Sequence, residues 1–374
     1  MEDYDSASGN YLQTTVNVFN FVYSKVYFFD HIYLYISGGS QFISVRIFFK
    51  KYPFVEDPIT GPVDVELFDK YLTWIRKRLL VRHENKKNNE DRYRKKMEAF
   101  ENDADYTYNF GITVVENKNW FYQLSMSGQL WNDEHIDVIF YYLRKKGKYD
   151  TRSTFKYTTV DCLFMQKVDQ TYLAYNNPET GPNVANEEDD ICQYVKGHRL
   201  HANVPWHSVD NILIPVNIKE DNHWILVVLS FNDSYDRRLY VYNSYRGGAG
   251  HNVVVKREIQ KLATLLPHYL HISGFYTKKI GINWMNHPAY MDMSQNENIQ
   301  VEYVENLSQQ DTNSVDCGIP TQIDAKMIRT RYDALLWDYA ARKIDEHAMS
   351  NIQAPPKLVR PAVDYDKVDT IDVT

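Results

Sequence analysis

The chain has 374 residues, and its formal net charge of −7 argues against a general nucleic-acid-binding protein, although a local basic patch stays compatible with it. Hydrophobic residues make up 44% of the sequence, which is enough for a substantial core, and the length is typical of about two domains. The three cysteines, Cys162, Cys192 and Cys317, provide neither a disulfide framework nor a metal-ligand spacing such as Cys-x-x-Cys. We therefore expect an intracellular protein of a reducing compartment, without a metal or other cofactor.

Residues 1–50 differ in composition from the rest of the chain. Between Val16 and Phe49 aromatic and β-branched residues are crowded together, but polar residues such as Asp30 and Arg46 interrupt them. A membrane-spanning helix needs about 20 consecutive apolar residues, and a signal peptide needs a basic start and a small-residue cleavage site. Because the segment has neither, we expect no membrane association. Packed accessory strands and a poorly determined terminus both stay open as interpretations.

Residues 51–108 are expected to form a helical accessory region. Apolar residues recur there at helical spacing, namely Phe68, Tyr71, Leu72 and Ile75. The stretch 82–96 that follows contains lysine and arginine clusters with interleaved acidic residues. Such a stretch is typical of a solvated helix face, and a weak nuclear-localisation or nucleic-acid patch is the alternative.

A larger domain, residues 109–350, is expected to follow. Near its start lies the segment Leu130-Trp131-Asn132-Asp133-Glu134-His135-Ile136-Asp137. The apolar run from Val138 to Leu143 predicts a helix, which Asn132 or Asp133 would cap. Further along, the acidic and turn-rich segment 178–190 predicts a surface loop or a short disordered insert.

Three runs of β-branched and aromatic residues predict strands in the middle of this domain. They cover 211–218, 223–231 and 238–244, and turn formers at 232–234 separate the last two. In an antiparallel hairpin, the start of one strand and the end of the next lie at the same edge. We therefore expect His223 and Asn243 side by side, an imidazole with an amide that can orient it.

The remaining predicted elements are a helix over 253–265, a short strand over 301–304 and a C-terminal helix over 323–343. In the C-terminal helix we expect Leu335, Leu336 and Trp337 to be buried. The tail 351–374 is expected to be disordered.

Cys317 stands at the beginning of the C-terminal helical pattern. Apolar residues recur behind it at a spacing of four, and Pro320 is compatible only with the first helical turn, so the helix is expected to begin at about Cys317 or Gly318. A thiol at that position faces the positive end of the helix dipole, which favours the thiolate. A small buried cysteine is the alternative, and for a lone cysteine it is the common case.

Four ordered motifs resemble the ubiquitin-like-protein (SUMO-type) proteases of the adenain-like cysteine protease superfamily. They are Leu130 to Asp137, His223-Trp224, Tyr242-Asn243-Ser244 and, after Gln309-Gln310, Asp316-Cys317-Gly318. The residues around 135–147 look most like the divergent plant members of this family, many of them transposon-associated. The resemblance implies an α+β fold, with a central mixed β-sheet flanked by helices and the nucleophile at a helix N-terminus.

The same resemblance implies a cysteine-type peptidase or isopeptidase. Cys317 would be the nucleophile, His223 its base and Asn243 the group that orients the base, while Gln310 would donate to the oxyanion. The implied substrate is the Gly-Gly terminus of SUMO or another ubiquitin-like modifier, released from a precursor or from a conjugate. The modifier and its conjugates are therefore the expected partners, and the nucleus rather than the cytoplasm is the expected location.

Three further residues would face the modifier by resemblance, namely Trp131, Asp133 and Trp224. For Trp224, which follows the catalytic histidine, the implied role is to cover the Gly-Gly tail in a narrow channel. Packing inside the strand core is the alternative for this residue. Nothing in the sequence indicates an oligomeric state.

Two departures from the family pattern leave alternatives open. Asn243 stands where the family has Asp, and an amide can fix the tautomer of an imidazole but cannot stabilise an imidazolium by charge. The family's oxyanion glutamine stands six residues before the cysteine, where this chain has Asp311, so a one-residue bulge would be needed to bring Gln310 into place, and Gln309 is the other candidate. A catalytically weak or inactive modifier-binding module, derived from a transposon, is therefore the main alternative. A third possible function is that of an accessory, nucleic-acid-associated protein of a mobile element.

Overall fold

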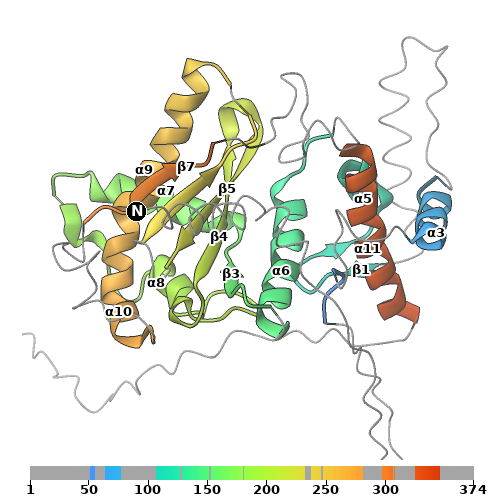
Figure 1. Cartoon of the computed structure of the whole chain (residues 1–374), viewed down its shortest axis with the longest axis horizontal. Coiled ribbons are helices and arrows are strands. Elements are labelled where there is room, and N and C mark those ends of the chain that lie inside the picture. The colour runs from blue at the N-terminus through green and yellow to red at the C-terminus, as the bar shows by residue number, and fades with distance from the viewer. Residues whose placement is uncertain are drawn as a thin grey trace, which may run out of the picture.

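The computed structural model describes residues 51–54, 64–76, 107–126, 129–150, 153–179, 181–231, 237–245, 247–280, 297–305, 307 and 325–345 (Figure 1). The predictions for residues 1–50, for the charged stretch 82–96 and for the tail 351–374 lie outside these ranges. The same holds for Gln309, Gln310 and Cys317, and for the expected start of the helix behind this cysteine.

A five-stranded mixed sheet forms the centre of the described structure, as predicted (Figure 1). In spatial order its strands are β3 (Tyr157–Thr159), β4 (Asn211–Ile218), β5 (His223–Ser230), β6 (Arg238–Tyr242) and β7 (Gln300–Tyr303). The three central strands are antiparallel to one another, whereas β3 pairs in parallel with β4, and β7 in parallel with β6. The predicted hairpin is the β5–β6 pair.

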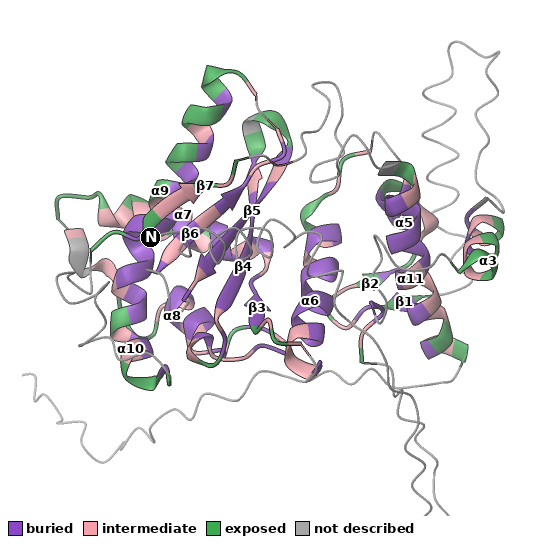
Figure 2. Ribbon diagram, in the orientation of Figure 1, coloured by how far each residue is buried: buried purple, intermediate pink, exposed green. Residues whose placement is uncertain are grey.

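The central strands are buried on both faces, because nearly every residue in them is apolar (Figure 2). In β5, Leu226 packs into the core on one face of the sheet, and Ile225 packs into the core on the other. Side chains alternate between the two faces along a strand, so a strand covered on both sides needs a continuous apolar run. The same alternation directs His223 to the side of Ile225, and Trp224 to the side of Leu226.

Helices cover both faces of the sheet (Figure 1). The helices on the Ile225 side are α7 (Cys162–Tyr175), α8 (Asp190–Val195), α9 (Ala249–Ile272) and α10 (Phe275–Lys278). The elements on the Leu226 side are α3 (Val65–Arg76), α5 (Lys118–Ser125), α6 (Asp133–Tyr149), α11 (Ala325–Asp345) and the hairpin of β1 (Tyr108–Asn109) with β2 (Val114–Val115). Short 3-10 turns are η1 (Gly181–Val184), η2 (Trp206–Ser208) and η3 (Lys219–Asp221). The α+β fold with a sheet flanked by helices is thus confirmed.

The helix predicted from Tyr71 and Ile75 is α3, and both side chains are buried. α3 packs against α11, where the hydroxyl of Tyr71 donates a hydrogen bond to the carboxylate of Asp333. The ring of Phe54 also meets that of Tyr332 in α11 edge to face, with centroids 5.4 Å apart. The described part of region 51–108 therefore shares the hydrophobic core of α11.

The predicted C-terminal helix is found as α11, but the expectation that three consecutive residues are buried was wrong for two of them. Leu336 is fully buried, whereas Leu335 and Trp337 are half-buried against the same core. Consecutive residues of an α-helix point in directions about 100° apart, so Leu336 points into the core while Leu335 and Trp337 lie at its edge. The helix predicted over 253–265 is the middle of the longer α9.

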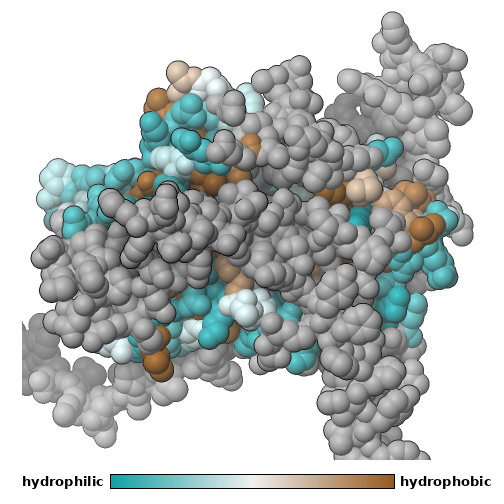
Figure 3. Space-filling model, viewed as in Figure 1, coloured by the Kyte–Doolittle hydropathy of each residue, from teal (hydrophilic) through white to brown (hydrophobic). Residues whose placement is uncertain are grey.

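Hydrophilic and hydrophobic residues alternate over the described surface on the face shown in Figure 3. The exposed large apolar side chains belong to different elements, for example Val65 in α3, Leu173 in α7 and Val253 in α9. Scattered single residues of this kind are normal on a protein surface. Within the described ranges, no helix combines the length and the apolar character that crossing a membrane requires.

Candidate active site

A tight turn between β4 and β5 places His223 at the end of the sheet. After Ile218 the chain forms the 3-10 turn η3, and Asn222 then takes a left-handed conformation with φ of 49°. Asparagine tolerates this conformation better than most residues. His223 begins β5 opposite Ile218 and is buried, with 1% of the residue exposed. The turn therefore holds the imidazole in a fixed position inside the protein.

Asn243 directly follows β6 and contacts His223, which confirms the adjacency predicted from the hairpin. Nε2 of His223 lies 2.9 Å from Oδ1 of Asn243. The backbone N–H of Tyr245 donates to the same oxygen at 3.0 Å. Because a backbone N–H only donates, this atom of Asn243 must be the acceptor oxygen, and Nε2 of His223 must carry the proton. In a neutral ring Nδ1 is then the nitrogen that can accept a proton.

The surroundings of His223 favour the neutral ring. Burial lowers the pKa of His223 from 6.5 to about 4, while the hydrogen bond with Asn243 acts in the opposite direction. A neutral imidazole is the form that can act as a general base. Of the two resting states that a cysteine–histidine pair can adopt, the low pKa favours the neutral pair over the ion pair.

Trp224 and Trp131 lie together on the other side of the sheet, although 93 positions separate them in sequence. The indole Nε1 of Trp224 donates to the carbonyl of Trp131 at 3.1 Å, and Nε1 of Trp131 donates to the carbonyl of Leu124 at 3.1 Å. Both indoles are half-buried and pack against the core on the Leu226 side. Two predicted modifier-facing residues are thereby brought together, and each keeps part of its surface open.

Arg329 of α11 holds the segment that carries Trp131. Its guanidinium carbon lies 4.9 Å from the centroid of the Trp131 ring. The same guanidinium donates from NH1 to the carbonyls of Met126 and Gln129, at 3.0 Å each. This cation thus links α11, the helix that follows Cys317 in sequence, to Trp131. The sequence analysis missed this arginine, since only the fold brings it near Trp131.

Asp133 is exposed at the start of α6, and its neighbour Asn132 is the cap of that helix. The Asn132 side chain accepts from the backbone N–H of His135, while the His135 ring accepts from the backbone N–H of Asn132. The sequence left Asn132 and Asp133 open as caps of this helix, and Asn132 is the residue that caps it. Asp133 and Trp224 both line a cavity of about 260 Å³. A position on this shared cavity is compatible with the modifier-facing role predicted for Asp133.

His135 is a second buried histidine, but its ring bonds only to backbone groups in the described contacts. Nδ1 accepts from Asn132 as part of the cap, and Nε2 lies 3.0 Å from the carbonyl of Trp120. Burial lowers the pKa of His135 to about 4. The ring therefore joins the start of α6 to α5 and has a structural role.

The two described cysteines are poor candidates for a nucleophile. Cys162 and Cys192 are free and buried. Burial raises the pKa of both thiols, and for Cys162 the nearby carboxylates of Asp137 and Asp133 act in the same direction. A thiol held in its protonated form is unreactive. Among the three cysteines this leaves Cys317, which the sequence pattern singles out.

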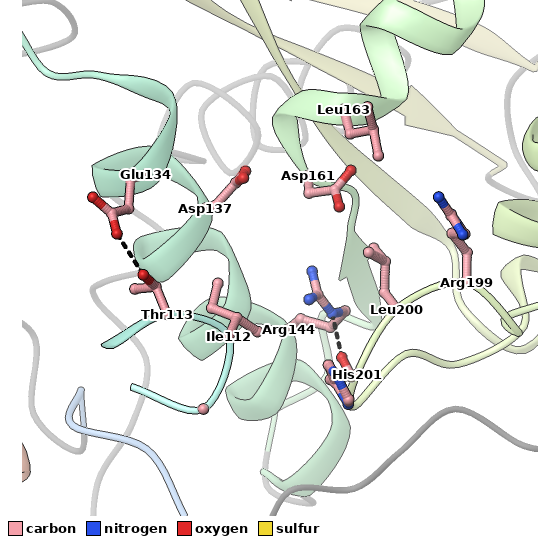
Figure 4. Close-up of a pocket in the computed structure, with 11 residues that line it drawn as sticks. Ile112, Thr113, Glu134, Asp137, Arg144, Asp161, Leu163, Arg199, Leu200 and His201 are labelled. Carbon is pink, nitrogen blue, oxygen red and sulfur yellow. Dashed lines mark hydrogen bonds between the residues drawn. The ribbon is translucent and has the colours of Figure 1, made fainter. Parts of the chain in front are cut away.

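A larger cavity, of about 530 Å³, lies between α6, the start of α7 and the segment 199–201 (Figure 4). Arg144 extends along its wall and donates from Nε to the carbonyl of His201 at 2.8 Å. Carboxylates and guanidinium groups both point into the cavity, among them Asp137, Asp161 and Arg199 (Figure 4). Charges of both signs line this cavity. None of the predicted site residues lines this cavity.

Two residues next to Asn243 were missed by the sequence analysis. Nδ2 of Asn243 lies 3.0 Å from Nε2 of His251, in the first turn of α9. Nδ1 of His251 in turn lies 2.6 Å from a carboxylate oxygen of Asp221, in the turn before His223. The only sequence signal was the proximity of Asp221 to His223, since His251 is brought back by the course of the chain after β6.

Comparisons with known proteins identify a family for this chain. Residues 129–321, more than half of the chain, match the family described as "Ulp1 protease family, C-terminal catalytic domain". One similar solved structure is titled "Crystal structure of the de-sumoylating protease"; it is 14% identical, and the match covers 65% of this chain and 94% of that chain with a TM-score of 0.39. A search of curated proteins gave no significant match. On the family match, this chain belongs to the Ulp1 protease family and carries its C-terminal catalytic domain.

Proposed function

We propose that the chain is an active cysteine peptidase or isopeptidase that cleaves after the Gly-Gly terminus of SUMO or another ubiquitin-like modifier. The observation that carries the proposal is the 2.9 Å contact of His223 Nε2 with the amide oxygen of Asn243. This contact fixes the tautomer in which the lone pair lies on Nδ1, the nitrogen that we propose as the base toward Cys317. The family implies a cysteine protease, and an oriented neutral histidine is what an active member requires.

The proposed cycle uses side chains of this chain alone. Nδ1 of His223 takes the thiol proton of Cys317, and the thiolate attacks the carbonyl carbon of the terminal glycine. The side chain of Gln310 and the backbone N–H of Cys317 hold the oxyanion, and each such donor is typically worth about 3 kcal/mol. His223 then protonates the leaving amine. Water, deprotonated by the same imidazole, hydrolyses the thioester and releases the modifier with its carboxylate.

The tryptophan pair supports the substrate class. Trp131 and Trp224 are half-buried and linked by a hydrogen bond, so they form a rigid apolar wall one residue from the base. A flat apolar wall suits a Gly-Gly tail, which has no side chains to bind. Asp133, exposed beside them, would bind the folded part of the modifier. We propose that this partner is met in the nucleus, and that the chain is closest to the plant, transposon-associated members of the family.

The test is covalent labelling by SUMO and ubiquitin that carry a C-terminal electrophile. We expect one of these probes to label the chain, Cys317→Ala to abolish the labelling and Asn243→Asp to retain or raise its rate, because a carboxylate also stabilises an imidazolium. Cys192→Ala, which removes a buried thiol of raised pKa, is the matched control and keeps the labelling. Binding of a modifier without labelling of the folded protein would favour the inactive binding module instead.

A further inference from the structure

We propose that His251 and Asp221 are positioning residues that act through Asn243 to orient and polarise the His223 base. The inference rests on the proposed function, because it gives a role to two side chains around the same base. Neither residue belongs to the motifs that carry the family resemblance. With Asn243 they extend the contact of His223 into a chain that ends on a carboxylate.

The direction of every hydrogen bond in this chain follows from one backbone group. The N–H of Tyr245 fixes Oδ1 of Asn243 as the acceptor, so the Nδ2 atom of the same amide must donate. Nε2 of His251, 3.0 Å away, must therefore accept, which places the proton of His251 on Nδ1. That proton points to Asp221, 2.6 Å away, and a carboxylate is an acceptor. One arrangement of protons thus fits all three contacts between these four side chains.

The His251 side chain packs so closely on position 247 that only a glycine fits there. Gly247 has a φ of +42°, and a Cβ added to it would lie 2.4 to 2.7 Å from three atoms of the His251 side chain. The ring of Tyr245 packs edge to face on His251, with centroids 4.9 Å apart. The His251 side chain is 2% exposed, whereas Asp221 is 33% exposed. The His251 imidazole is therefore held on several sides, whereas the carboxylate of Asp221 reaches water.

These hydrogen bonds compensate in part for the lack of a net charge on the Asn243 side chain. An amide carries no net charge, but its oxygen becomes a stronger acceptor when its N–H donates to a good acceptor, because bonds in a chain polarise one another. Asp221 accepts from Nδ1 of His251 and thereby makes Nε2 of His251 the better acceptor. The effect reaches Oδ1 of Asn243, which faces His223. When His223 becomes an imidazolium during catalysis, this oxygen stabilises it more than an isolated amide would.

This series of hydrogen bonds also requires that Nε2 of His251 carries no proton. A protonated ring would present N–H groups on both sides, and Nε2 would then face the N–H of Asn243 with no acceptor between them. The groups that face His251 are Asp221 from the turn before β5, His223 from β5, and Asn243 and Tyr245 from the segment after β6. The arrangement therefore depends on Nε2 of His251 accepting from the amide of Asn243.

Two substitutions in the full chain test the inference, with a fluorogenic substrate that ends in the Gly-Gly of SUMO. His251→Phe keeps the ring but loses both hydrogen bonds, and we expect kcat to fall about tenfold or more with KM unchanged, as for other partners that orient a functional imidazole. Asp221→Asn keeps an acceptor oxygen and loses the charge, so kcat falls less. The acid limb of its kcat/KM profile moves to lower pH, because the Asp221 charge raises the pKa of His223.

A rescue separates positioning from folding. Adding Asn243→Asp to His251→Phe brings a carboxylate directly to His223, and we expect kcat to recover at least in part. Controls of the same chemistry are His271→Phe, exposed at the other end of α9, and Glu187→Gln, an exposed carboxylate paired with Lys196. Both controls keep wild-type kcat and KM.

The outcomes distinguish this inference from the proposed function. If the wild-type chain is labelled by the probe and both His251→Phe and Asp221→Asn keep its kcat, KM and pH profile, the positioning role is wrong and the protease stands. A loss of kcat that follows a fall in melting temperature and is not rescued by Asn243→Asp also overturns it. Absence of labelling in the folded wild-type chain overturns both.

Discussion

Two buried histidines lie on opposite sides of the sheet, His135 at the start of α6 and His223 at the start of β5. Burial lowers the pKa of each to about 4, so both rings are neutral at pH 7. They differ in their partners. The described bonds of His135 go to backbone groups of Asn132 and Trp120, whereas His223 bonds to the side chain of Asn243.

This difference shows that a perturbed pKa alone does not identify a base. Backbone partners on both nitrogens of His135 leave its ring no position from which to accept a further proton. The side-chain amide at His223 places the proton on Nε2, so the lone pair of the neutral ring lies on Nδ1. A substitution at each histidine should therefore have a different consequence.

The largest expected effect is on turnover. His223→Ala removes the base, and we expect kcat to fall about 10³-fold, the middle of the range for general acid–base catalysis. His135→Gln keeps an acceptor for the capping box and leaves kcat within the error of the measurement. Steady-state hydrolysis of the SUMO substrate measures both. Equal losses in the two variants would remove the distinction between a structural and a chemical histidine.

The next effect is on stability in acid. The unfolded chain protonates a histidine below its ordinary pKa of 6.5, whereas folded His135 stays neutral down to about pH 4. The unfolded state thus binds more protons in this window, and the free energy of unfolding decreases as the pH falls from 6.5 to 4. The loss from His135 reaches about 3 kcal/mol at pH 4.

Urea unfolding of wild type and His135→Gln between pH 4 and pH 7 measures this difference. We expect the two free energies to converge as the pH falls, because the variant lacks the titrating ring. Buried carboxyl groups of raised pKa, such as Asp137, oppose the trend equally in both proteins. If the free energies of unfolding of the two proteins changed in parallel with pH, His135 would not be the group that titrates.

The smallest effect concerns the neighbour of His223 on the other face of β5. Trp224→Phe keeps an aromatic ring and loses the hydrogen bond to the Trp131 carbonyl, which is worth about 1 kcal/mol, or about fivefold in binding. We expect KM for the SUMO substrate to rise by about this factor with kcat unchanged, whereas Tyr172→Phe on α7 changes neither. A fall in kcat instead of a rise in KM would place Trp224 with the chemistry of its neighbour.

The sequence predicted those elements whose signal is local. The strand over 211–218 was found with its bounds, since a run of apolar and β-branched residues needs no partner to be recognised. β3 was missed, because its three residues become a strand only by pairing with β4. The contact of His223 with Asn243 followed from hairpin geometry, whereas His251 came from a separate helix and had no local signal.

Arg329 has a consequence for the order in which the site can form. The carbonyl groups of Met126 and Gln129, and the ring of Trp131, all depend on a cation about 200 positions later in the chain. While the protein is being synthesised, the ribosome makes Trp131 long before it reaches Arg329 in α11. The nascent chain therefore lacks the cation that holds the segment 126–131 until synthesis has passed α11.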